Sequence, residues 1–336
     1  MVKIGSKIDE IRIDGRLDML RRDLEQFVAL DIEAVELPVH GLDAIMHGRL
    51  NRSRLAAVKS ILQNYGFTYS VHAPNPLNLM DDSLRPLHYQ VFRSSLEFTA
   101  EIGSAILVYH AGRYVPEEAF SIPGDLQLSD ADRASLLDCE ASAIRDLADE
   151  FPDVCICIEN ARPYLYHSPY CYAENPRELL EQVARIGRPN VRVILDTGHL
   201  YMAAKHHHFD TVETAAALRD VIAHAHVHDN FGLSIYHTEK QQTHLVPFGR
   251  GDAHMPVGWG EIPIGAILET FVDSYEGLII TELRSRYFEH TRESIDNLKT
   301  ILRNLKAEPK PAATKVGHCE TRNRFVIPDI SQGGRG

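Results

Sequence analysis

Histidines alternate with small or apolar residues in one short segment of the chain. His224, His226 and His228 follow one another at a spacing of two, so a strand would place all three on one face. A glycine-rich segment follows, in which Asp252 and His254 are also two residues apart. Carboxylates and imidazoles held by glycine turns suit a divalent cation. We therefore expect metal-binding chemistry here, in preference to a set of solvated loop histidines.

Apolar, strand-like runs alternate with helical patterns along the chain, which is the order of parallel βα units. Eight strands are expected, at 2–8, 34–39, 68–72, 105–110, 154–159, 191–196, 222–227 and 277–282. Eight helices are expected, at 17–30, 52–65, 84–102, 131–150, 176–186, 212–221, 264–272 and 291–306. This alternation predicts an α/β protein with a closed (β/α)8 TIM barrel. A doubly wound open sheet is the alternative, but it would need a glycine-rich phosphate loop that the sequence lacks.

The length of 336 residues suits a single barrel domain at 1–306 followed by a C-terminal tail at 307–336. The tail fits either a disordered extension or an arm that packs on a neighbouring molecule. The apolar residues 325–328 favour the arm, and with it a homo-oligomer formed through the tail.

The balance of 35 basic against 47 acidic residues gives a formal net charge of −12. An acidic surface repels phosphate backbones, so we expect no nucleic-acid partner. The N-terminus lacks the layout of a signal peptide, and no apolar run approaches the ~20 residues of a membrane span. We expect no membrane association. Cys155 and Cys157 alternate within a strand-like run and are expected to be buried thiols, in keeping with a cytoplasmic protein.

Ligand-type side chains occur at, or just after, the expected ends of strands three to eight. In a barrel these carboxyl ends converge on one face, where chemistry takes place. Burying several carboxylates together would be costly without a cation to neutralise them. We therefore expect a cluster of divalent metal ions. The nine candidate ligands are His72, His110, Glu159, Asp196, His199, His226, Asp252, His254 and Glu282.

The pattern at these positions resembles the xylose-isomerase-like barrel superfamily (AP endonuclease family 2), and within it the endonuclease IV type, over residues 1–306. The matching motifs are His-Ala-Pro at His72, His-Ala-Gly at His110, Glu-Asn at Glu159, Asp-Thr-x-His at Asp196 and His199, His-x-x-Asp at His226, Asp-x-His at Asp252 and His254, and the last strand at Glu282. Members of that type hydrolyse phosphodiesters at a trinuclear, zinc-dominated centre. The resemblance implies zinc or manganese, at two or three ions per chain.

Sugar isomerases and epimerases of the same superfamily use one metal, whose ligands would here be Glu159, Asp196, His226 and Glu282. The additional histidines and Asp252 favour a multinuclear centre. Our main hypothesis is metal-dependent hydrolysis of a phosphodiester in a small-molecule or nucleotide-like substrate, with Glu159, Glu282 and Asp196 as catalytic residues. The alternative is a sugar or sugar-phosphate isomerase or epimerase with one metal. A non-catalytic, metal-stabilised subunit is a third alternative.

Arginines follow the expected ends of strands four, five and eight, at Arg113, Arg162 and Arg284. Their paired N–H donors suit a phosphate or a carboxylate, so we expect them to bind a small-molecule substrate. Ion pairs with local acids are the alternative for each of them. His228 is assigned to the substrate too, with a role in orienting His226 as its alternative. Tyrosines at 164, 166, 170 and 172 fit either a lid over the substrate or a packed interface.

Overall fold

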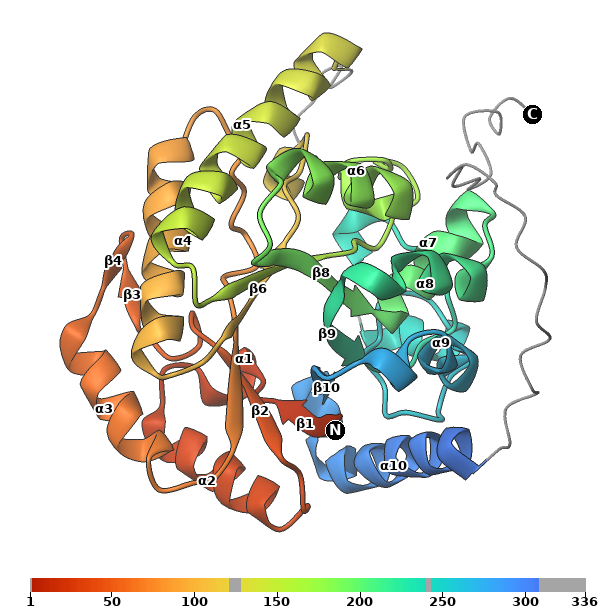
Figure 1. Cartoon of the computed structure of the whole chain (residues 1–336). Coiled ribbons are helices and arrows are strands. Elements are labelled where there is room, and N and C mark those ends of the chain that lie inside the picture. Colours follow the sequence, from red (N-terminus) through yellow and green to blue (C-terminus); the bar gives the residue numbers. More distant parts are fainter. Residues whose placement is uncertain (1, 121–127, 240–242, 308–336) are drawn as a thin grey trace, which may run out of the picture.

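Eight parallel strands close into a barrel that is surrounded by helices (Figure 1). This computed structural model describes residues 2–120, 128–239 and 243–307. Around the barrel the strands are β1 Lys3–Lys7, β2 Ala34–Pro38, β5 Thr68–His72, β6 Ile106–His110, β7 Cys155–Glu159, β8 Val191–Asp196, β9 Ile222–Val227 and β10 Leu278–Thr281, which pairs with β1. Each strand coincides with one of the eight expected strands, so the prediction of a (β/α)8 barrel is confirmed.

Eight helices follow the strands as the sequence predicts. They are α2 Leu17–Val28, α3 Arg52–Leu62, α4 Arg85–Glu101, α5 Asp130–Glu150, α6 Pro176–Ile186, α8 Thr211–Leu218, α9 Ile264–Glu269 and α10 Thr291–Ala307. Side chains of Asn51, Ser129 and Asn175 accept hydrogen bonds from the first turns of α3, α5 and α6. Such caps replace backbone partners that a helix lacks at its start, which explains why these boundaries were readable from the sequence.

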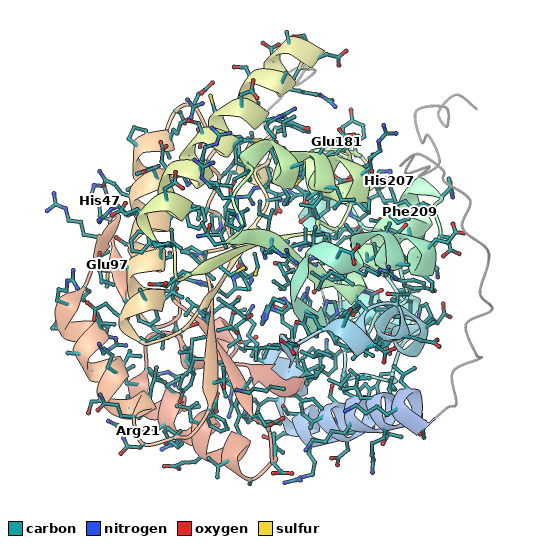
Figure 2. The ribbon with its side chains drawn as sticks, viewed as in Figure 1. Arg21, His47, Glu97, Glu181, His207 and Phe209 are labelled. Carbon is teal, nitrogen blue, oxygen red and sulfur yellow. The ribbon has the colours of Figure 1, made fainter. Side chains whose placement is uncertain are left out.

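Several smaller elements were not predicted. They are the helices α1 Glu10–Ile13 and α7 Thr197–His207, the hairpin of β3 Ile45–Met46 with β4 Arg49–Leu50, and the 3₁₀ segments Glu117–Ala119, Tyr172–Glu174, Arg219–Val221, His237–Glu239, Thr243–Phe248, Val272–Ser274 and Ser285–His290. Residues 206–208 lie at the end of α7. There His207 Nε2 is 3.0 Å from a carboxylate oxygen of Glu174, and His208 ends the helix in the left-handed conformation (Figure 2).

Helix α7 matters for the site because it begins without any loop after β8. Asp196, the last residue of the strand, accepts a hydrogen bond from the backbone N–H of His199 at 2.6 Å. The side chain of Asp196 therefore caps the helix. This cap fixes the two side chains of the Asp-Thr-x-His motif relative to each other.

The interior of the barrel is apolar at its base and polar where the strands end. Val108, Cys157 and Ile194 form a small buried cluster of their own, separate from the larger clusters. Side chains alternate along a strand, so His110 and Glu159, two residues beyond Val108 and Cys157, point to the same interior. The thiols of Cys155 and Cys157 lie 3.6 Å apart and are free, as expected for an internal layer of the barrel.

The helices cover the outer faces of the strands, and side chains fill the layer between them (Figure 2). In α2, for example, Leu20, Leu24 and Phe27 are buried at the spacing of one helix face. None of the described helices combines the length and apolar character needed to cross a membrane. The predicted C-terminal tail begins as α10 ends, and residues 308–336 lie outside the described part of the chain.

Gly5 of β1 lies where two neighbouring strands of the barrel pack closely, so a substitution there tests that packing. A Cβ atom there would overlap the backbone oxygen of Ala34 on β2, which cannot move without shifting that strand. We expect Gly5→Ala to lower the free energy of unfolding by ~1–3 kcal/mol, measured by urea denaturation. Gly66→Ala is the matched control, because nothing lies within 4 Å of a Cβ at that position. Equal stability of the two variants would contradict this packing.

Candidate metal centre

Four buried side chains meet where β7 to β10 end. They are Glu159, Asp196, His226 and Glu282, and they offer ligand atoms that all lie within 4.8 Å of one another. The Nδ1 atom of His226 lies 3.4 Å from a Glu159 oxygen, 3.1 Å from Glu282 and 3.9 Å from Asp196. Three carboxylates around one imidazole nitrogen form a site that is rich in hard ligands for a divalent cation.

Glu159 joins this group to a second one formed with His72 and His110. Its Oε2 atom lies 3.0 Å from Nε2 of His110 and 3.7 Å from Nε2 of His72. The other oxygen, Oε1, is the one that faces His226. The carboxylate of Glu159 therefore bridges two groups of ligands, and both of its oxygens are buried.

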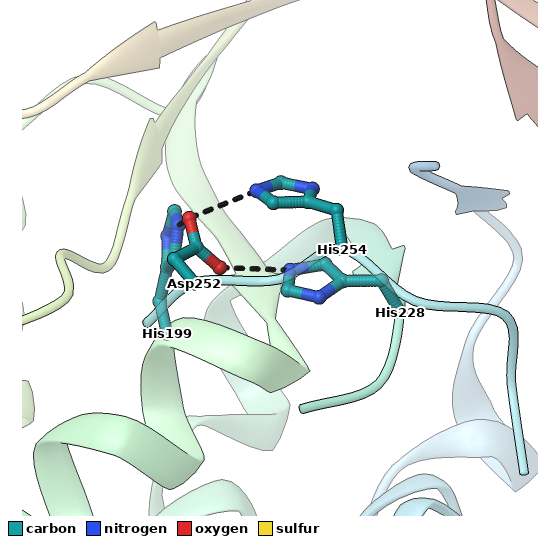
Figure 3. Close-up of side chains that lie close together, drawn as sticks. All are labelled: His199, His228, Asp252 and His254. Carbon is teal, nitrogen blue, oxygen red and sulfur yellow. Dashed lines mark hydrogen bonds and ion pairs between the residues drawn. The ribbon is translucent and has the colours of Figure 1, made fainter. Parts of the chain in front are cut away.

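A third group consists of His199, His228, Asp252 and His254 (Figure 3). One oxygen of Asp252 lies 3.2 Å from Nε2 of His199 and 2.9 Å from Nε2 of His254. The ring of His228 stacks on that of His254 at 3.9 Å between centroids. Because Nε2 of His228 also lies 3.1 Å from Asp196, this group adjoins the first one.

The rings of three of these histidines are oriented by backbone carbonyl groups. A carbonyl oxygen only accepts hydrogen bonds, so Nδ1 carries the hydrogen and the lone pair of the neutral ring lies on Nε2, which faces the carboxylates. Histidines that bind metals are held in this way by a partner on the other ring nitrogen. The three bonds are His72 Nδ1 to Ala73 O at 2.7 Å, His199 Nδ1 to Asn160 O at 3.0 Å and His254 Nδ1 to Glu282 O at 3.1 Å.

Buried polar atoms without hydrogen-bond partners lie within the cluster. They include Nε2 of His72, Oε1 of Glu159, Nδ1 of His226 and Oδ1 of Asp252. Such atoms are rare in folded proteins because each loses its hydration without compensation. Oxygen and imidazole nitrogen atoms are also the usual ligands of zinc and manganese. The residues therefore fit one or more divalent cations.

Burial disfavours the charged form of every carboxylate in the cluster, but neighbouring imidazole and ammonium groups outweigh it. The imidazole of His110 holds the pKa of Glu159 well below its usual range. Lys7, followed by His226, does the same for the pKa of Glu282. Burial lowers the pKa of His110 to about 4. At His199 burial also opposes protonation, yet Asp196 and Asp252 raise its pKa to about 10.

A cleft of about 460 Å³ opens over these ligands, a size that suits a small molecule. Arg113, Arg162 and Arg284 line it, together with Arg286. Arg162 lies 3.4 Å from a carboxylate oxygen of Asp252, and Arg113 lies 3.8 Å from Glu117. Arg284 donates to the backbone oxygen of Asp252 and contacts no carboxylate among the described residues. The structure thus brings all three predicted arginines to the cleft, and two of them already have acidic partners.

The position of His228 corrects its assignment as a substrate-binding residue. The side chain is completely buried, does not line the cleft and is bonded to Asp196 behind the other ligands. Gly198 makes room for it, because a Cβ there would overlap the imidazole ring. The tyrosines of the 162–174 segment resolve in a similar way. Tyr164, Tyr170 and Tyr172 are buried, which fits the packed alternative, whereas Tyr166 is 79% exposed.

Two residues that belong to the site were missed in the sequence. Glu36 on β2 is buried between His224 and His226, and Lys7 at the end of β1 bonds to the carboxylate of Glu282. Glu36 is the single charged residue of the otherwise apolar strand β2, which was its only signal, whereas Lys7 shares β1 with Lys3 and had no such signal. Trp259 packs on Tyr287 and donates to Glu293.

Comparison with known proteins gives consistent results for nearly the whole chain. The sequence model of a family described as xylose isomerase-like TIM barrel matches residues 24–307. An uncharacterized protein of Methanocaldococcus jannaschii is 24% identical over 288 residues, which cover 84% of this chain and 96% of that protein.

Solved structures of sugar epimerases have the same fold. A D-tagatose 3-epimerase-like protein has a TM-score of 0.67 and 22% identity, covering 91% of this chain and 98% of its own. The 3-keto-D-glucoside 4-epimerase of E. coli has a TM-score of 0.61 and 16% identity, covering 89% of this chain and 100% of its own. A D-psicose 3-epimerase has a TM-score of 0.58 and 15% identity, covering 90% and 98%.

Metal binding should compete with protons at His199. With a pKa of about 10 in the metal-free protein, the ring is protonated at neutral pH. A cation that takes Nε2 must displace that proton. We expect the affinity for Zn²⁺ to fall as the pH is lowered from about 8 to about 6, with release of at least about one proton per chain at pH 7.

Calorimetry in two buffers of different ionisation enthalpy measures this release. The exposed His47 lies outside the cluster, so His47→Gln serves as a control that should release the same number of protons. Binding without proton release, at an affinity that does not change with pH, would contradict the assignment of His199 as a ligand.

Proposed function

Because the chain belongs to the xylose isomerase-like TIM barrel family, we propose that it is a divalent-metal-dependent enzyme that isomerises or epimerises a sugar or a sugar phosphate. The observation that carries this proposal is the buried group of Glu159, Asp196, His226 and Glu282 beneath a cleft of small-molecule size. The sugar epimerases among the similar structures support it. The proposal replaces phosphodiester hydrolysis as the leading hypothesis.

A divalent cation bound by these four residues would polarise the carbonyl and hydroxyl oxygens of the substrate. The chain itself supplies two carboxylates, Glu159 and Glu282, which are held in the ionised form by their cationic neighbours. An ionised carboxylate can remove a proton from the carbon next to a carbonyl group, and the second carboxylate, once protonated, can return one. Lys7 anchors Glu282 from one side and lines the same cleft.

The arginines of the cleft support a substrate that carries an anionic group. Arg284 has no acidic partner among the described residues, so its guanidinium is available to a phosphate or a carboxylate of the substrate. Arg113 and Arg162 extend the same wall and balance nearby acids. A sugar phosphate would satisfy both parts of the cleft, with its carbonyl end over the carboxylates and its phosphate near the arginines.

Incorporation of solvent deuterium tests the reaction type. Metal-loaded protein incubated in D₂O with ketoses and ketose phosphates should place deuterium on a carbon beside the carbonyl group, observed by NMR. Glu159→Gln should abolish this exchange, by at least ~10³-fold, because it removes both a ligand and a base. The circular dichroism spectrum should stay unchanged. Full exchange in Glu159→Gln would refute the assigned role, and no exchange with any substrate by the parent protein would refute the proposed reaction.

Hydrolysis of a phosphodiester is a second candidate, favoured by one specific observation. His72 and His110 share Glu159 with the four-ligand group, and His199, Asp252 and His254 form a further group beside it. One cation needs only about four ligands, so these residues exceed the need of a single ion. Two adjacent cations could polarise a phosphoryl group between them.

Removal of His72 and His110 together separates the two candidates. We expect the variant His72→Ala/His110→Ala to bind about one cation fewer per chain by elemental analysis, because Glu159 alone remains of that group. Deuterium exchange should persist, since the four-ligand group is intact. If the variant instead loses hydrolysis of bis(p-nitrophenyl) phosphate in step with the lost cation, hydrolysis becomes the better account. An unchanged metal content would show that these histidines are not ligands.

A further inference from the structure

Glu36 is the only charged residue of the buried strand β2. It is completely buried in β2, where Val35 and Leu37 on either side are buried as well. An ionised carboxylate is costly in such surroundings unless it is hydrogen-bonded. Its oxygens lie 2.7 Å from Nε2 of His226 and 2.8 Å from Nε2 of His224. These contacts cross the interior of the barrel, because β1 and β10 separate β2 from β9 in the sheet.

The distances identify these contacts as hydrogen bonds and not as the sides of another metal site. Two ligands of one tetrahedral cation, each about 2.1 Å from the ion, lie about 3.4 Å apart. Separations of 2.7 and 2.8 Å are those of hydrogen bonds between an imidazole and an oxygen. The other nitrogen of His226, Nδ1, faces the four-ligand group, with Glu159 at 3.4 Å and Glu282 at 3.1 Å.

The hydrogen bond decides which nitrogen of His226 can bind a cation. An ionised carboxylate has no hydrogen to donate, so Nε2 of His226 must be the donor to Glu36. The lone pair of the neutral ring is then on Nδ1, which faces Glu159 and Glu282. Backbone carbonyls have this function for His72, His199 and His254. At His226 the partner is a side chain, so it can be removed by substitution.

We infer that Glu36 is a positioning residue of the metal centre: by accepting the Nε2–H bond of His226, it directs Nδ1 of that ring at the carboxylates. His224 occupies the second oxygen and keeps the carboxylate in place. The inference rests on the metal centre of the proposed function but not on the reaction, so it stands whether the substrate is a sugar or a phosphodiester.

Glu36→Gln tests the inference with little change in shape. A glutamine offers one accepting oxygen and one amide nitrogen that only donates, so it cannot accept from both His224 and His226. We expect the affinity for Zn²⁺ to fall about 10–100-fold, measured by competition with a chromophoric chelator. Nitrogen NMR of the histidine rings in the zinc-loaded protein should show a changed protonation pattern for His226, whose signals are assigned with His226→Gln.

Ser70→Ala is the matched control. The hydroxyl of Ser70 donates at 3.0 Å to the same oxygen of Glu36 as His224 does, and Glu36 keeps both of its oxygens when that hydroxyl is removed. This variant should bind Zn²⁺ within about 3-fold of the parent. Parental affinity and parental His226 signals in Glu36→Gln would overturn the inference. So would an equal loss of affinity in both variants accompanied by equal loss of thermal stability, since that result means general packing. A zinc-loaded parent without any exchange activity would refute the proposed reaction alone.

Discussion

Mutual repulsion among buried carboxylates is the constraint on which the polar half of the barrel depends. Glu36, Glu159, Asp196, Asp252 and Glu282 are all buried near the ends of the strands. Like charges so close together in a medium of low polarity would destabilise the fold if no groups of opposite charge compensated them. The chain surrounds them with imidazoles, with Lys7 and with Arg162. These partners come from many different strands and loops, so a closed barrel is needed to bring them together.

Hydrogen bonds of the backbone explain how loop residues of the site are positioned as firmly as those on strands. Asp229 follows β9 and accepts hydrogen bonds from the backbone of Gly258 and Ile262, which ties the glycine-rich segment to the strand. A Cβ at position 260 would overlap Asp229 and the backbone of Asn230. Only glycine therefore lets this turn pack so closely against the residues that follow β9. The segment between them carries Asp252 and His254. Backbone packing thus helps to place these two side chains beside His199.

Much of this arrangement could be predicted from the order of residue types along the chain. A strand that ends in His, Glu or Asp directs that group to the open face of a barrel, so His72, Glu159 and His226 were identifiable before any contact was known. Contacts that cross the barrel were not identifiable. Glu36 lies nearly two hundred positions before its partner His226, so its charge within an apolar strand could not indicate which residue it contacts. The burial of His228 could not be predicted either. Its spacing from His226 suggested a residue that faces the substrate, but its side chain is buried away from the cleft.

The two candidate functions share one site, and they differ in how many cations it holds. The similar structures are sugar epimerases, whereas the number of ligands around Glu159 exceeds what one cation needs. The central claim is common to both: the four-ligand group binds a divalent cation. Anomalous diffraction from crystals grown with Mn²⁺ tests this claim most directly. We predict an anomalous peak at about 2.0–2.2 Å from Glu159, Asp196, Nδ1 of His226 and Glu282. A map without a peak there, with the Nδ1–H of His226 donated to Glu282 instead, would contradict the account.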